Sequence, residues 1–203
     1  MSRRRGKSAE RLDRQVTGEL QKLGMKGALF TTIVERLENN AFQDEDLEIH
    51  LSPRGWDRVE FAIRTNVGEE IHPLAEIASG GELSRITLIL KQLEVEEKRI
   101  STLIFDEIDT GLGADLGGVV AERLAELSRR YQIICITHLP QVAAQAVHHI
   151  RVEKQVKGER TIASARILEG RERVAEIARM LGGKGKLREE LAEELLDDGQ
   201  ERP

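Results

Sequence analysis

The chain has 203 residues, of which 39% are hydrophobic and 33% are charged, and its formal net charge is −5. These values are typical of a soluble globular chain with one sizeable core and a small appendage. No apolar run approaches the roughly 20 residues of a membrane-spanning helix, and the basic N-terminus lacks the apolar segment of a signal peptide. Composition therefore excludes a membrane protein, and the negative charge makes the whole chain a poor electrostatic partner for DNA.

Charge is nevertheless uneven between the two ends of the chain. Residues 1–14 carry six basic and two acidic side chains, whereas residues 186–203 carry three basic and seven acidic ones. The basic end could contact nucleic-acid phosphates, although a solvated helix face is the commoner explanation of such a run. The single cysteine, Cys135, lies in an apolar strand pattern, which predicts a buried structural thiol and fits a reducing cytoplasm.

The first predicted element is an amphipathic helix over residues 8–23, capped by Ser8. Its narrow apolar stripe consists of Leu12, Val16, Leu20 and Leu23. One short helix of this kind is not stable alone, so we expect it to lie on a core or to pair with another helix. A β-rich portion follows, with strands near residues 28–37, 47–51 and 59–63 and a turn at 53–55.

From residue 78 onward, helical and strand patterns alternate. Helices are expected over residues 82–96, 114–130, 140–147 and 171–181, strands over 102–106 and 132–136, and a hairpin over 148–168 that turns at 157–158. This alternation predicts an α/β fold in which helices flank a parallel sheet. A loosely attached acidic helix is expected over residues 186–198.

A glycine-rich stretch, Ser79-Gly80-Gly81-Glu82, opens the helix expected at 82–96. Glycine lets the backbone approach a ligand closely, and a helix N-terminus offers unpaired N–H groups, so the stretch suits a phosphate. Four apolar residues are expected on one face of this helix: Leu83, Ile86, Leu90 and Leu93. Taken alone, the stretch is better explained as an ordinary turn before a capped helix.

Two adjacent carboxylates, Asp106 and Glu107, end the apolar strand at 102–106. Ligands of α/β sheets sit at the carboxyl ends of the strands. One acid can hold Mg²⁺, usually through water, while the other orients or deprotonates an attacking water. Asp109 follows in a glycine-bearing loop, and His138 ends the next apolar strand, where it could reach the same phosphate. Each feature alone is also compatible with a polar turn or a structural histidine.

The order of these features resembles the C-terminal half of an ABC-type ATPase head. The resemblance implies that Ser79, Gly80, Gly81 and Glu82 form the signature motif, which contacts ATP bound to a second head. It implies that Asp106 supports Mg²⁺ through water and that Glu107 is the catalytic glutamate. Asp109 would belong to the loop that contacts ATP across the head dimer, and His138 would sense the γ-phosphate.

Within that superfamily, Glu82 and Ile108 stand where transporter ATPases usually have Gln and Pro, which disfavours a transporter subunit. The longer strings resemble the RecN family of DNA repair proteins, and they occupy residues 77–85, 105–111, 137–143 and 173–183. The resemblance implies a coiled-coil end over 1–24, the C-terminal half of the head over 25–183 and an acidic tail over 184–203. It also implies ATP-dependent double-strand-break repair and recombination, DNA ends or single-stranded overhangs as partners, and a nucleoid-associated cytoplasmic location.

The chain departs from the family pattern because it has no phosphate-binding loop of the form G-x-x-x-x-G-K-[ST]. Gly6-Lys7-Ser8 imitates the end of this Walker A motif, but no strand precedes it, and we interpret the match as coincidence. The expected site therefore needs a Walker A half of the same head and a second head, and the isolated chain should not hydrolyse ATP. The alternative is a non-catalytic half-head that pairs with another head and regulates it.

Overall fold

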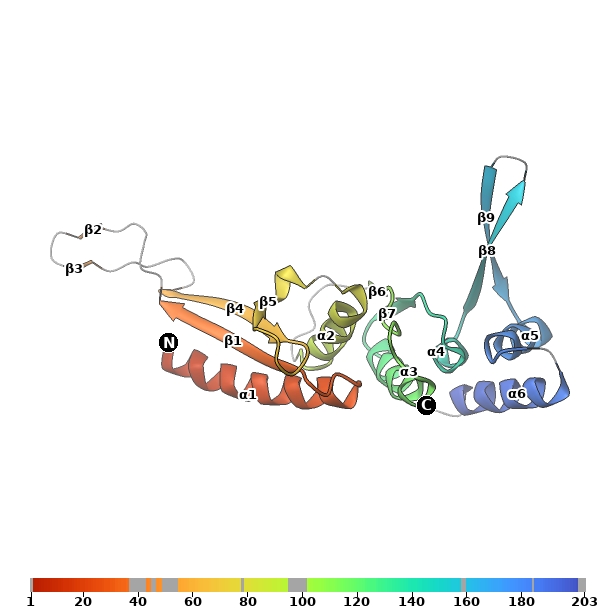
Figure 1. Ribbon diagram of the computed structural model, residues 1–203, viewed down its shortest axis with the longest axis horizontal. Helices are drawn as coiled ribbons and strands as arrows, with labels where there is room; N and C mark the ends of the chain where they lie inside the picture. The colour runs from red at the N-terminus through yellow and green to blue at the C-terminus, as the bar shows by residue number, and fades with distance from the viewer. Residues whose placement is uncertain are drawn as a thin grey trace. The chain divides into compact units, whose positions relative to one another are not determined.

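The computed structural model describes residues 2–36, 43–44, 47–48, 55–77, 79–94, 102–157, 160–183 and 185–200. The chain forms two compact units, Met1–Glu96 and Glu97–Pro203, and each is described by itself (Figure 1). Neither boundary of the predicted three-part division, at residues 24 and 183, coincides with the division into units. None of the helices in the described ranges combines the length and the apolar character needed to cross a bilayer.

The first unit combines helices with short antiparallel sheets. Its elements are α1 (Ser2–Lys22), β1 (Leu29–Arg36), β2 (Gln43–Asp44), β3 (Leu47–Glu48), β4 (Asp57–Arg64), β5 (His72–Pro73), a 3₁₀ turn (Leu74–Glu76) and α2 (Gly80–Gln92). A three-stranded sheet has the order β1-β4-β5, and β2 pairs with β3 separately. The meander is thus confirmed for β1 and β4. Most of the strand expected over 47–51 and part of the turn at 53–55 lie outside the described residues, and β5 was not predicted.

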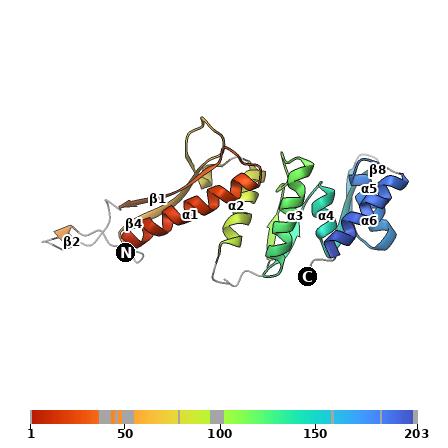
Figure 2. The ribbon, with the colours of Figure 1, turned by 90° about the horizontal axis from the view of Figure 1, so that it is seen from below.

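Helix α1 packs along β1, as Figure 1 and Figure 2 both show. The stripe residues Val16, Leu20 and Leu23 are fully buried. Two polar contacts fix the pairing: the Thr17 hydroxyl oxygen accepts from the Phe30 backbone N–H at 3.0 Å, and the Thr32 hydroxyl donates to Asp13 at 2.6 Å. The helix therefore lies on a core, one of the two arrangements that the stripe predicted.

The predicted start of α1 at Ser8 was wrong, because the helix already includes Ser2. Two contacts hold the additional turns against β4. The Ser2 hydroxyl and the Arg5 guanidinium both donate to the Asp57 carboxylate, each at 2.8 Å. These bonds lower the pKa of Asp57, with the Ser2 hydroxyl as the main cause and Arg5 next. Sequence periodicity missed these turns because polar contacts, rather than an apolar stripe, secure them.

The second unit contains the parallel α/β portion. Its elements are β6 (Thr102–Phe105), α3 (Ala114–Ser128), β7 (Gln132–Cys135), α4 (Pro140–Gln145), β8 (His149–Lys157), β9 (Arg160–Leu168), α5 (Gly170–Met180) and α6 (Lys186–Gln200). Strands β6 and β7 pair in parallel with Ile104 opposite Ile134, which confirms the predicted parallel sheet. The hairpin pairs His149 with Leu168 at its base, also as predicted.

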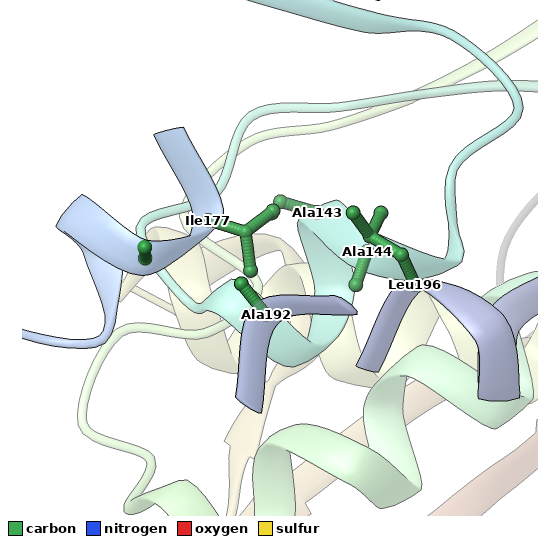
Figure 3. Packing of buried hydrophobic residues seen from close by; sticks show 6 residues of the cluster. Ala143, Ala144, Ile177, Ala192 and Leu196 are labelled. Atoms are coloured by element: carbon green, nitrogen blue, oxygen red, sulfur yellow. The ribbon is translucent and has the colours of Figure 1, made fainter. Parts of the chain in front are cut away.

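Helices α4, α5 and α6 enclose a small apolar core (Figure 3). The buried residues of this core are Ala143, Ala144, Ile177, Ala178, Ala192 and Leu196. Because Ala192 and Leu196 lie four residues apart on α6, they face the core together while the acidic residues lie elsewhere on the helix. The expectation that α6 is loosely attached was therefore wrong.

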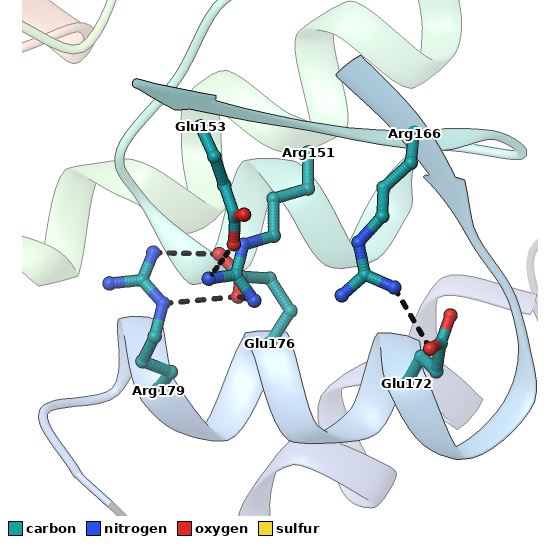
Figure 4. Close-up of polar contacts among 6 residues, drawn as sticks. All are labelled: Arg151, Glu153, Arg166, Glu172, Glu176 and Arg179. Carbon is teal, nitrogen blue, oxygen red and sulfur yellow. Dashed lines mark hydrogen bonds and ion pairs between the residues drawn. The ribbon is translucent and has the colours of Figure 1, made fainter. Parts of the chain in front are cut away.

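Ion pairs fasten the base of the β8–β9 hairpin to α5 (Figure 4). The Glu176 carboxylate is buried, with 5% of its side chain exposed, and it receives Arg179 in a two-pronged contact at 2.6 and 3.0 Å. Arg151 of β8 reaches the same carboxylate at 3.0 Å and also pairs with Glu153. One acid on α5 therefore links the helix to the hairpin.

Close packing at Gly199 gives a first testable prediction. A Cβ atom at this position of α6 would lie 2.8 Å from the Ala144 carbonyl oxygen, which itself accepts a hydrogen bond from Arg173. We expect Gly199→Ala to lower the free energy of unfolding by about 1 to 3 kcal/mol, since the backbone must move to relieve the contact.

The matched control is Gly118→Ala in α3, where a Cβ atom would meet nothing within 4 Å. It should raise stability by up to about 1 kcal/mol, because alanine is the better helix former. Urea unfolding of the two variants checks the pair, and equal effects would contradict the close approach of α6 to α4.

Candidate functional site

The glycine-rich stretch forms the N-terminus of α2. Ser79 is the N-cap residue, and its side chain accepts a hydrogen bond from the Glu82 backbone N–H at 3.4 Å. The helix begins at Gly80, two residues earlier than predicted, so both glycines lie in its first turn. Ser79 and Gly80 are exposed, whereas Gly81 is buried. A capped helix start and an anion site are compatible, because both use the same unpaired N–H groups.

The buried face of α2 differs from the predicted one. Ile86 is fully buried as expected, but Leu83 is 40% exposed, and Leu88 and Ile89 are buried although the predicted face omitted them. Helix α2 packs against α1 within the first unit, and that contact selects a face slightly rotated from the sequence stripe. Ser79 and Gly80 at the helix start remain exposed.

Asp106 and Glu107 follow β6 directly, and both are exposed. Glu107 has a φ angle of 55° and is the one non-glycine residue with a positive φ among the described residues. A non-glycine residue in this left-handed region is strained, and such residues concentrate at functional sites. The Glu107 carbonyl accepts from the Thr110 backbone N–H at 2.9 Å, which closes a tight turn. The turn sends Ile108 and Asp109 into the interior.

The buried Asp109 carboxylate joins the ends of β6 and β7. Its Oδ2 atom accepts from the Thr137 hydroxyl, from the His138 backbone N–H at 2.9 Å and from the Leu139 backbone N–H at 3.3 Å. The His138 ring nitrogen Nδ1 lies 3.2 Å from the same oxygen. The hydrogen bonding between β6 and β7 also continues one residue past β7, since the Ile136 backbone N–H donates to the Phe105 carbonyl oxygen at 2.9 Å. The two loops that carry the predicted site residues are therefore tied together.

Asp109 is buried, with 2% of its side chain exposed. The contact with ATP across a head dimer, which the family resemblance implies for Asp109, stays a prediction. The tight turn at Glu107 points the carboxylate inward, towards Thr137 and His138. The His138 side chain, by contrast, is 69% exposed and remains accessible to a ligand.

The predicted site residues fall into two groups. Asp106, Glu107, Asp109 and His138 all lie in the second unit, at the carboxyl ends of β6 and β7. Ser79, Gly80, Gly81 and Glu82 belong to the first unit. Sequence reasoning missed Thr137, whose hydroxyl donates to Asp109 and accepts from the Leu139 N–H at 3.0 Å. The sequence feature that could have indicated Thr137 is its position between the apolar strand and His138.

Cys135 at the end of β7 is an unreactive thiol. Burial raises its pKa to about 12, with the charges of Asp109 and Asp106 as further causes. A thiol with a raised pKa has little of the nucleophilic thiolate form. The residue is only half-buried, so its environment rather than complete burial makes it a structural residue.

The carboxylate of Asp106 suits the Mg²⁺ that the family resemblance implies. In the described part of the chain, no three His, Cys, Asp or Glu residues form a ready-made metal cage. Mg²⁺ bound with a nucleotide does not need such a cage, because one or two carboxylates and the substrate phosphates hold it. Asp106 is exposed at the sheet edge, and its carboxylate is a donor of this kind.

The architecture is shared with the heads of SMC proteins. The Smc head domain with a coiled coil and joint from Pyrococcus yayanosii aligns with a TM-score of 0.51 at 23% identity, over 86% of this chain and 29% of that one. The fold is accordingly that of part of an Smc-type head: a parallel sheet with helices, accompanied by antiparallel strands. No family model matches the chain.

Sequence relatives identify the family. DNA repair protein RecN of Treponema pallidum is 45% identical over 184 residues, which are 90% of this chain and 31% of the relative. RecN of Haemophilus influenzae is 41% identical over 197 residues, covering 97% and 33%. RecN of Bacillus subtilis is 38% identical over 181 residues, covering 86% and 31%. The chain belongs to the RecN family and corresponds to the C-terminal part of these relatives, about a third of their length.

Proposed function

We propose that this chain forms the C-terminal part of an ATPase head that engages a second head through ATP during DNA double-strand-break repair and recombination. The observation that carries the proposal is the position of Asp106, Glu107 and His138 after two paired parallel strands, in loops that Asp109 ties together. The relatives named DNA repair protein RecN support the biological setting. In this setting the complete protein acts on DNA ends or single-stranded overhangs, in the cytoplasm at the nucleoid.

Each residue has a distinct part in the proposed reaction. Asp106 supports the Mg²⁺ that accompanies ATP, and Glu107 orients and deprotonates the water that attacks the γ-phosphate. His138 contacts the γ-phosphate of the same head, and the exposed ring of this residue suits that contact. Mg²⁺, when bound, neutralises charge on the phosphates.

The signature residues act on the ATP of the partner head. Ser79 and Gly80 are exposed at the start of α2, where backbone N–H groups and a partial positive charge favour a phosphate. Gly81 and Glu82 complete the first turn of that helix. In the proposed dimer, ATP lies between this helix start and the phosphate loop of the opposite head, so that hydrolysis releases the two heads.

The second unit exposes an apolar surface that the proposed Walker A half would cover. Ile104, Ile134 and Ile136 are 67%, 46% and 56% exposed on the β6–β7 sheet. Parallel sheets are normally covered on both faces, so such exposure is unusual for a finished α/β core. The remainder of a RecN-type head, which also supplies the phosphate loop, is the occupant that we propose.

The hairpin presents a second uncovered apolar face. The strand register places Ile150 opposite Ile167, and Val152 and Val156 share their side of the β8–β9 ladder. These four side chains are between 58% and 76% exposed. Because the opposite side of the hairpin carries the ion pairs to α5, this face is available for the same completing segment.

Complementation tests the proposal. The chain alone is expected to show no ATP hydrolysis, and addition of a RecN N-terminal segment carrying the Walker A motif should restore both ATP binding and turnover. Glu107→Gln in the completed head is the control, because it should remove turnover that takes place at this site. ATP binding without any turnover in the completed protein would favour the alternative, a non-catalytic half-head that regulates another head. Turnover by the chain alone that Glu107→Gln abolishes would contradict the need for a second half.

A further inference from the structure

The Asp109 carboxylate does more than satisfy buried backbone groups. An ionised carboxylate only accepts hydrogen bonds, and here one of its oxygens faces a hydroxyl, two backbone N–H groups and an imidazole nitrogen. The first three contacts would occur in any side-chain cap of a loop. The fourth is a separation of 3.2 Å between His138 Nδ1 and the same oxygen, which places the buried carboxylate beside a residue of the proposed ATP site.

We propose that Asp109 is a positioning residue that fixes the orientation and the tautomer of His138. A neutral imidazole carries its proton on one nitrogen only, and the hydrogen-bond partner of one nitrogen sets the state of the other. Because Oδ2 of Asp109 can only accept, Nδ1 carries the proton. The second nitrogen, Nε2, is then unprotonated in the neutral ring and is the one that the exposed side chain offers to a ligand.

The surrounding contacts make this arrangement rigid. The Asp109 side chain is 2% exposed, so water does not compete for its oxygen. The Leu139 N–H divides its hydrogen bond between Asp109 at 3.3 Å and the Thr137 hydroxyl at 3.0 Å. The carboxylate therefore holds the residues on both sides of His138 as well as its ring.

The arrangement has a consequence for the proposed contact with the γ-phosphate, and this consequence rests on the proposed function. A phosphate oxygen accepts hydrogen bonds, and the neutral His138 described here presents an acceptor at Nε2. Donation from Nε2 therefore requires a second proton on the ring, taken from solvent, while Nδ1 keeps its own. The resulting imidazolium would face a phosphate on one side and the Asp109 carboxylate on the other.

The tautomer can be measured on the chain as it is, without ATP. Long-range proton–nitrogen NMR correlations of a chain labelled with ¹⁵N-histidine distinguish protonated from unprotonated ring nitrogens. The chain has five histidines, so the His138 signals are assigned by their loss in His138→Gln. Spectra are recorded at about pH 8, which is above the ordinary histidine pKa of about 6.5.

We expect wild-type His138 to show a protonated Nδ1 and an unprotonated Nε2. Asp109→Asn should shift the ring towards the Nε2-protonated form that prevails for histidine in water. Thr137→Val is the matched control: it removes the hydroxyl from the same cluster but leaves the carboxylate, so stability should fall while the tautomer is retained.

Three results would overturn the proposal: an Nε2-protonated ring in the wild type, an unchanged tautomer in Asp109→Asn, or an equal shift in Thr137→Val. The wild-type spectrum is decisive even if Asp109→Asn fails to fold. Since no nucleotide is involved, failure of the ATPase proposal would leave these outcomes unaffected.

Discussion

Glu176→Ala is expected to lower the free energy of unfolding by about 2 to 3 kcal/mol. The substitution leaves Arg151 and Arg179 beside an apolar core with no carboxylate between them. Removing one partner of a fully buried pair costs about 3 to 5 kcal/mol. The expected loss is smaller here because the Arg151 and Arg179 side chains are 29% and 58% exposed and can recover hydration. Urea unfolding followed by circular dichroism measures the loss.

The contribution of Glu176 to the free energy of unfolding should also depend on pH. Hydrogen bonding from Arg179 lowers the pKa of Glu176, and the charges of Arg179, Arg151 and His149 act in the same direction. Because the pKa is lower in the folded state, the stabilisation is fully present above the ordinary glutamate pKa of about 4.3. It is lost as the pH falls below that value towards the native pKa. The stability difference between wild type and Glu176→Gln should therefore shrink in acid, and a constant difference down to about pH 3 would contradict the ion pair.

Glu107→Gln in the completed, paired heads is expected to reduce ATP turnover by about 100-fold or more. General-base catalysis contributes about 10² to 10⁴ in rate, and glutamine retains the shape of glutamate but cannot take the proton from water. ATP binding should persist, because the proposed phosphate loop holds the nucleotide and Glu107 acts on the attacking water. The measurement is steady-state phosphate release beside equilibrium ATP binding. Wild-type turnover in Glu107→Gln would remove Glu107 from the proposed mechanism.

Periodicity predicted the alternating elements of the second unit well, because β6, α3 and β7 each have a simple apolar pattern. The site residues at the ends of β6 and β7 could be predicted for the same reason, because Asp106 and His138 each follow a short apolar strand. Parallel pairing then brings those ends to one edge of the sheet. These features follow from local sequence and a general rule of α/β folds.

Features that depend on distant contacts were not predictable in the same way. Asp109 resembles a surface loop residue in the sequence, and only the left-handed turn at Glu107 buries it against Thr137. Helix α6 looks like a solvated acidic segment because its composition outweighs the two core positions at Ala192 and Leu196. In each case a tertiary contact, absent from the local pattern, decides which side of the residue or helix is buried.

The signature interpretation makes a distinct prediction for Ser79. Arginine at this exposed helix start would place a bulky side chain where two heads must meet over the γ-phosphate. Ser79→Arg also removes the cap of α2, at a cost of about 1 kcal/mol, so its thermal unfolding must be followed in parallel. Ser128→Arg is the matched control, since Ser128 is exposed in the last turn of α3, where a positive charge is favourable.

Light scattering of the completed heads with ATP tests the central claim most directly. In the Glu107→Gln background, where ATP remains intact, we expect ATP to double the measured mass. The added Ser79→Arg change should leave the mass at that of a single head while ATP binding persists, and the added Ser128→Arg change should still allow the doubling. If the Ser79→Arg heads pair with ATP as well as their parent, the glycine-rich stretch is only a capped helix start and the proposed head engagement is wrong.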